Sequence, residues 1–314
     1  EEALGMYREL AQAHPGVYLQ DVAMTLSNLG NAQHSLNKLE AARLSLEESL
    51  AIKCELARSR PEVYRPSVAN VLNNLGSVNH DLNDLEAAQA NLDEALTIRR
   101  GLAQGRPEVY RPQVAETLTN LGAVQTDLKH LEAAQASFEE SLRICRELAQ
   151  VRPEVYRPDV AMTLSNLGNV QSELSHREAA RANFEEAVTI ERELARARPE
   201  VYQPQVALTL TNLGAVQYDF RDLEAARASF EEALTIQREL AGARPEVYQP
   251  QVANLLINIG KVQIHLCELE AARDRFQDAL TIYRELARSR PSVYQPKVAW
   301  TLTNLGTLQR DLMD

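Results

Sequence analysis

The chain has 314 residues, a formal net charge of -11 and a pI near 5.2. An acidic chain without a clustered basic face is a poor partner for nucleic acid or for an anionic membrane surface, so we exclude both. No apolar run is long enough to span a bilayer and no segment resembles a signal peptide, which favours a cytoplasmic protein. Charged residues make up 25% of the chain and aromatics only 5%, with Ala, Leu, Glu and Arg abundant, as is typical of an all-helical protein.

One tripeptide returns along the chain at a fixed interval of 46 residues. Asn-Leu-Gly, or Asn-Ile-Gly in one copy, ends at Gly30, Gly76, Gly122, Gly168, Gly214, Gly260 and Gly306. A repeat of this length predicts one helical hairpin stacked on copies of itself, in a single array over residues 1–314. We expect a partial repeat at 1–14, repeats at about 15–60, 61–106, 107–152, 153–198, 199–244 and 245–290, and a partial repeat at 291–314.

The chain begins within a second helix, residues 1–14, and each later copy then runs through the same order of elements. In one copy, apolar residues from Val114 to Leu128 recur every three or four positions, which predicts an amphipathic helix A over 112–128. A short turn at 127–130 leads to helix B, from 131 to about 152. All thirteen prolines fall between helix B and the next helix A, and we expect pairs such as Pro153 and Pro158 to bracket a non-helical connection.

The repeat glycine lies inside helix A, where glycine costs up to about 1 kcal/mol relative to alanine. Close packing against helix B, at small pairs such as Ala133-Ala134, would explain it. Cys54, Cys145 and Cys267 are widely spaced, so we interpret them as reduced thiols embedded in helices. No catalytic motif, phosphate loop or metal-ligand set is present, and we predict neither enzyme activity nor a cofactor or metal.

These features resemble the tetratricopeptide repeat. Leu121-Gly122, Ala134, Phe138 and Ser141 stand at the spacing of that family, although Leu118 and Gln125 replace two aromatics of its helix A. The stretch from Val114 to Gly122, with Glu231 to Ile236, is similar to the kinesin-light-chain-like subclass with a lengthened repeat. The resemblance implies a right-handed superhelix, an all-α solenoid in which helix A lines a concave groove that holds peptides or helices of partner proteins.

Two rows of helix A residues lie beside the apolar stripe and are candidates for partner binding. The asparagine row, two positions before each glycine, is Asn28, Asn74, Asn120, Asn166, Asn212, Asn258 and Asn304. Its amides either hold the backbone of a bound peptide or bond adjacent repeats together, and the sequence leaves both interpretations open. The acidic row, five positions after the glycine, is Asp81, Asp127, Glu173, Asp219 and Asp311, and it would attract a basic partner or simply face solvent.

The leading prediction is a protein-interaction scaffold that binds a peptide or helix in the groove. The alternatives are a sensor or regulatory arm of a larger signalling protein, whose nucleotide-switch or protease-like effector lies elsewhere, and a structural spacer. The chain begins in the middle of a helix B and stops after a helix A, so we expect a fragment of a longer protein. Apolar end faces would then allow end-to-end self-association.

Overall fold

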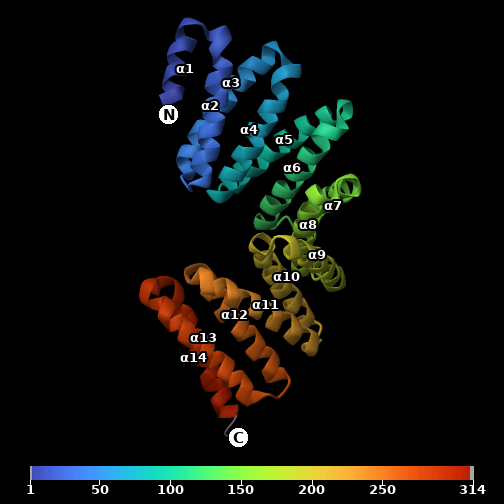
Figure 1. The fold of residues 1–314 in the computed structure, drawn as a ribbon, viewed down its shortest axis with the longest axis vertical. Coiled ribbons are helices and arrows are strands. Elements are labelled where there is room, and N and C mark those ends of the chain that lie inside the picture. Colours follow the sequence, from blue (N-terminus) through green and yellow to red (C-terminus); the bar gives the residue numbers. More distant parts are fainter. Residues whose placement is uncertain (1, 312–314) are drawn as a thin grey trace. The chain divides into compact units, whose positions relative to one another are not determined.

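The computed structural model describes residues 2–311, and every regular element in that range is an α-helix (Figure 1). This confirms the all-α, tetratricopeptide-like prediction. The helices are α1 (Glu2–Ala13), α2 (Pro15–Ser35), α3 (Leu39–Ser59), α4 (Pro61–Asp81), α5 (Leu85–Gly105), α6 (Pro107–Asp127), α7 (Leu131–Val151), α8 (Pro153–Glu173), α9 (Arg177–Ala197), α10 (Pro199–Asp219), α11 (Leu223–Ala243), α12 (Pro245–His265), α13 (Leu269–Ser289) and α14 (Pro291–Asp311). Even-numbered helices are helix A and odd-numbered helices are helix B.

The helices form two compact units, the first reaching to Asp159 and the second beginning at Val160. Within the first unit each helix from α1 to α7 packs on the next, and α2, α4 and α6 also contact one another in sequence. The second unit repeats this pattern from α9 to α14, with a contact between α10 and α12. Neighbouring hairpins therefore bury one another's apolar faces within each unit. The single continuous array over all repeats stays a prediction.

Helix A ends in the same turn in six copies, and the turn has no glycine. After α6, the Lys129 amide donates to Thr126 and the His130 amide to Gln125, which is the Schellman arrangement. Lys129 has φ 62°, and the equivalent residues Asn37, Asn83, Ser175, Arg221 and Cys267 share the left-handed conformation. Cys267 is therefore exposed in a turn, and the prediction that it lies within a helix was wrong.

The connection between helix B and the next helix A is shorter than predicted. Helix α6 begins at Pro107, the first proline of the pair, and Pro112 lies inside it. The first proline suits a helix start because the amide of that position has no helical partner. The second proline has no amide proton, so one hydrogen bond is missing near the start of the helix. The rest of the helix is continuous. Pro66, Pro158, Pro204, Pro250 and Pro296 occupy the same position in their helices.

The repeat glycine packs on one large side chain of helix B. A Cβ built at Gly168 would lie 2.8 Å from ring carbons of Phe184, and the equivalent contact at Gly76 is 2.5 Å from Leu92. Such distances leave no room for a side chain. Close packing was thus predicted correctly. The nearest atoms belong to a phenylalanine or leucine sixteen positions on, and the carbonyl of the second paired alanine, Ala42 or Ala272, is also close at Gly30 and Gly260.

A polar contact also closes four of the described hairpins, at Gln33, Gln125, Gln171 and Gln217, where the family usually has an aromatic residue. The Ser137 hydroxyl of α7 donates to Gln125 Oε1 of α6 at 2.8 Å, and Ser229 does the same to Gln217 at 2.7 Å. Both glutamines are buried, so the bond satisfies a side chain that would otherwise be costly to bury. The replacement at Gln125 is therefore accommodated by a partner on helix B.

Candidate functional site

The asparagine row lies on the face of helix A and is only partly used inside the protein. Asn28 is exposed and the other six are half-buried. The Asn74 amide donates to Asn31 of the preceding helix A at 2.9 Å, as the Asn212 amide does to Asn169. The Asn120 amide lies 3.4 Å from Asn73 Oδ1, and Asn304 donates to the Trp300 carbonyl of its own helix at 3.0 Å. Asn28, Asn166 and Asn258 make no side-chain hydrogen bond to another described residue.

A hollow of about 380 Å³ opens over this row in the first unit. Asn28 and Asn31 of α2 and Asn74 of α4 line it, and Lys53 and Arg99 enter it from helix B. Its other lining residues are Met24, Ser27, Asn70, Val71, Gln113 and Glu116. The asparagine row thus borders a polar cavity in this unit.

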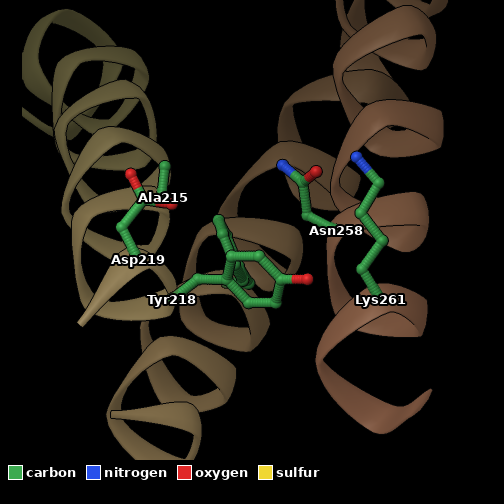
Figure 2. Close-up of a pocket in the computed structure, with 6 residues that line it drawn as sticks. Ala215, Tyr218, Asp219, Asn258 and Lys261 are labelled. Carbon is green, nitrogen blue, oxygen red and sulfur yellow. The ribbon is translucent and has the colours of Figure 1, made fainter. Parts of the chain in front are cut away.

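The second unit has two hollows on its helix A face, of about 250 Å³ and 580 Å³. In the smaller one, Tyr218 reaches from α10 towards α12, where Asn258 and Lys261 project, and Asp219 lies at its edge (Figure 2). Asn258 and Lys261 also line the larger hollow, with Tyr283 and Trp300. The Nζ of Lys261 lies 5.2 Å from the centre of the Trp300 ring, a cation–π distance.

The acidic row contacts the preceding repeat in the first unit. His34 Nε2 lies 2.6 Å from Asp81 Oδ2, and His80 Nε2 lies 2.6 Å from Asp127 Oδ2. Both aspartates keep about half of their side-chain surface exposed, so they can still attract a charged ligand. Glu173 and Asp219 are exposed, and the side chain of Asp311 lies outside the described residues.

A third row, not predicted from the sequence, lies on helix B twenty-three positions after each of the first six repeat glycines. Its members differ in every copy: Lys53, Arg99, Cys145, Glu191, Gln237 and Tyr283. All except Lys53 are at most 5% exposed. We call this set the buried row. A residue that changes chemistry at a fixed position of helix B was the available signal, but Cys145 was interpreted only as a reduced thiol embedded in a helix.

The buried row lies beneath the helix A face, between one helix A and the next. Arg99 donates to Asn73 of α4 at 3.2 Å and to Thr117 of α6 at 2.5 Å. Glu191 accepts from Thr209 at 3.1 Å, and Thr209 shares a hydrogen bond with Ser165 at 3.1 Å. Thr209 and Ser165 stand at the same positions of the repeat as Thr117 and Asn73. Arg99 and Glu191 therefore lie beside polar side chains at the same two positions of the repeat.

Burial shifts the pKa of Lys53, Arg99, Glu191 and Tyr283, and it lowers the pKa of the Arg99 guanidinium. It lowers the pKa of the Lys53 ammonium to about 8 and raises the pKa of the Glu191 carboxyl to about 7. The second oxygen of Glu191 has no hydrogen-bond partner in the described structure. Tyr283, whose pKa is raised to about 12 by burial and then by Tyr294, donates to Asn254 at 2.6 Å. Lys53 and Glu191 thus carry charges that their surroundings do not fully compensate.

The described residues contain no group of three or more His, Cys, Asp or Glu side chains suited to a metal ion. None of the helices described is both long and apolar enough to cross a bilayer.

Sequence comparison identifies the repeat. The model of the tetratricopeptide repeat matches residues 22–57, 68–103, 114–151 and 206–246. The chain is a tetratricopeptide repeat protein. A model of anaphase-promoting complex subunit 5 matches residues 157–198 of this tetratricopeptide protein, and no curated protein sequence matches it significantly.

Solved structures of tetratricopeptide type resemble the chain in fold. The crystal structure of BtubC (BKLC) from P. vanneervenii is 20% identical, with a TM-score of 0.63 over 79% of this chain and 92% of that one. The apo form of RapI is 16% identical, with a TM-score of 0.61 over 93% and 98%. A Rap protein complexed with competence and sporulation factor is 15% identical, with a TM-score of 0.55 over 98% and 80%. At these identities the likeness concerns the fold alone.

Proposed function

We propose that the chain is a protein-interaction scaffold, and that peptides or helices of partner proteins bind on the helix A face of its units. The observation that carries this proposal is the set of asparagine side chains that border the hollows and stay unpaired. Asn28 in the first unit and Asn258 in the second each line a hollow without an internal hydrogen bond. An amide in this state can both donate to and accept from the backbone of an extended ligand.

The similar Rap protein, whose crystal structure is that of a complex with competence and sporulation factor, supports ligand binding as a use of this fold. The unpaired amides do not distinguish one peptide sequence from another, because every peptide backbone offers the same N–H and C=O groups. Selectivity then depends on side chains that vary between repeats, such as Met24, Glu116 and Trp300 at one helix A position. The acidic row adds an attraction for basic side chains at the ends of helix A, so association with a basic peptide should slow as salt concentration rises.

The row contains its own matched pair for a test of this proposal. Asn28 has no internal bond, whereas Asn74 donates to Asn31 of the neighbouring repeat. We expect Asn28→Ala to weaken peptide capture and leave the melting temperature unchanged. We expect Asn74→Ala to lower the stability of the first unit by about 1 kcal/mol, the usual net contribution of one hydrogen bond.

Capture is measured by selecting a displayed library of random dodecapeptides on each variant, and stability by urea unfolding. Equal capture by the parent and Asn28→Ala would contradict the proposed role of the row. A regulatory arm of a signalling protein uses the same binding face, and the attached effector would distinguish it from a free-standing scaffold. End-to-end self-association stays a prediction, and a monomeric sedimentation profile at high concentration would contradict it.

A further inference from the structure

Four residues of the second unit depart from the pattern of the repeat, and all four line the hollow of about 580 Å³. Lys261 follows its repeat glycine directly, where the other copies have Asn, Ser, Ala or Thr. Lys297, nine positions before the next repeat glycine, is the only basic residue at its position. Tyr283 and Trp300 are the only aromatic residues at theirs. Four separate departures that meet in one cavity indicate a requirement beyond the packing of hairpins.

The hollow carries two positive charges. The chain has five lysines, and two of them line this cavity, whereas no aspartate or glutamate is among its lining residues. Within the described residues, neither the Lys261 nor the Lys297 ammonium donates a hydrogen bond or lies within ion-pair distance of a carboxylate. Two such cations, in a chain whose net charge is -11, match an anion that carries two charges.

Aromatic rings hold both lysines in place. Lys261 Nζ lies 5.2 Å from the centre of the Trp300 ring, and Lys297 Nζ lies 5.5 Å from the centre of the Tyr283 ring. Tyr283 is buried and donates to Asn254 at 2.6 Å, so its ring is fixed. A cation–π contact positions an ammonium group and leaves its charge in place, because the ring has no net charge.

The same cavity has an apolar wall and a free amide. Trp300 is 45% exposed, and Ile257 and Pro296 also line the hollow. Asn258 projects from α12 beside Lys261 (Figure 2) and makes no side-chain hydrogen bond to another described residue. A flat ring can therefore stack on the indole while its polar edge bonds to the amide.

We propose that this hollow binds a nucleoside monophosphate, with its base on Trp300 and its phosphate between Lys261 and Lys297. A phosphate monoester carries a charge of about -1.5 to -2 at pH 7, which matches two ammonium groups better than a single carboxylate does. The volume lies within the roughly 300–1,000 Å³ that is usual for pockets holding whole small molecules. This site goes beyond peptide binding and does not depend on it.

The repeat itself supplies replacements that the fold accepts at these positions. Lys261→Ala copies Ala215, Lys297→Gln copies Gln251, and Trp300→Leu copies Leu208. Lys38→Gln removes one lysine charge from the exposed turn after α2, in the first unit, and is the matched control.

The test is a calorimetric titration of the parent and the four variants with adenosine monophosphate. We expect each lysine substitution in the hollow to weaken binding about tenfold or more, as for the loss of a charge-assisted bond. Trp300→Leu should weaken binding about fivefold or more through lost stacking, and Lys38→Gln should bind like the parent. Trp300 is the only tryptophan of the chain, so saturable quenching of its fluorescence should accompany binding to the parent.

Adenosine tests the ring alone and inorganic phosphate tests the anion alone, and we expect each to bind about tenfold more weakly than the nucleotide. No saturable binding to the parent, or equal binding by the parent and the double variant Lys261→Ala/Lys297→Gln, would overturn the proposal. Tighter binding of a phosphotyrosyl peptide than of the nucleotide would overturn it in favour of a modified peptide. Melting curves confirm that each variant is folded. Peptide capture is tested separately with Asn28→Ala, so the two proposals can fail independently.

Discussion

The two units share a backbone and differ in what they place beneath the helix A face. In the first unit the buried row begins with the cations Lys53 and Arg99, and the hollow above them is lined mainly by polar side chains. In the second unit the same positions hold Glu191, Gln237 and Tyr283, and the larger of the two hollows described has Trp300 and Ile257 in its wall. One position of the repeat can therefore change the chemistry of the surface while the hairpin stays the same.

The hairpin that both units share depends on the repeat glycine. A substitution of this glycine should therefore have the largest effect on stability. Gly168→Leu would force the side chain into Phe184 and open the hairpin, and Gly168→Ala should cost about 1–3 kcal/mol through overpacking. Gly306 has nothing within 4 Å of an added Cβ, so Gly306→Ala should instead stabilise α14 by up to about 1 kcal/mol. Urea unfolding measures both. A Gly168→Leu variant as stable as the parent would refute this packing.

The buried row of the second unit contains a glutamate, and this difference from the first unit should make the stability of the second unit depend on pH. Glu191 has a pKa of about 7 in the folded protein and an ordinary pKa of 4.5 in the unfolded chain, so the folded state holds an extra proton between those pH values. Its contribution to stability is present below pH 4.5 and is lost as pH rises to 7. Glu191→Gln does not titrate at this position. Its free energy of unfolding, relative to that of the parent, should therefore increase by roughly 3 kcal/mol when the pH is raised from 4.5 to 8. The measurement is the unfolding free energy of both proteins at the two pH values, and a constant difference would contradict it.

Titration of Lys53 should change the free energy of unfolding by a smaller amount, in the opposite direction and at higher pH. Its folded pKa of about 8 lies below the ordinary 10.5, so the unfolded state holds more protons in that interval. Stability of the parent should rise from pH 8 to pH 10.5, and Lys53→Gln should lose this rise. Because Lys53 is only partly buried, solvent reduces the size of the effect relative to Glu191. Denaturant unfolding of the two proteins across this range would show the difference, and parallel curves would exclude it.

The sequence predicted the hairpins because their signals are local. Apolar spacing from Val114 to Leu128 predicted helix A, and helix B was expected over 131–152, close to the observed Leu131–Val151. The start of helix A was misplaced because proline was treated as a boundary on both sides of the connection. A proline near a helix end loses one bond and the later turns still form, so Pro112 could be included in α6.

The site was harder to predict because its parts come from three helices. The asparagine row can be recognised within one helix, and its role in binding stays a prediction. To predict the buried row, one must know that Arg99 of helix B lies between Asn73 and Thr117, which belong to two successive A helices. Likewise, the His34–Asp81 pair joins residues that are 47 positions apart, a contact that no periodicity within one helix reveals.

The proline inside helix A also affects how each repeat opens. Pro112 has no amide proton, so the carbonyl of Glu108 lacks the donor that a continuous helix would supply. The entrance turn of α6 can detach at this point and leave the remaining turns folded. In α2 the same position is Gln20, which restores the missing donor. Amide hydrogen exchange should therefore find the entrance of α2 better protected than the entrances of the helices that carry the inner proline.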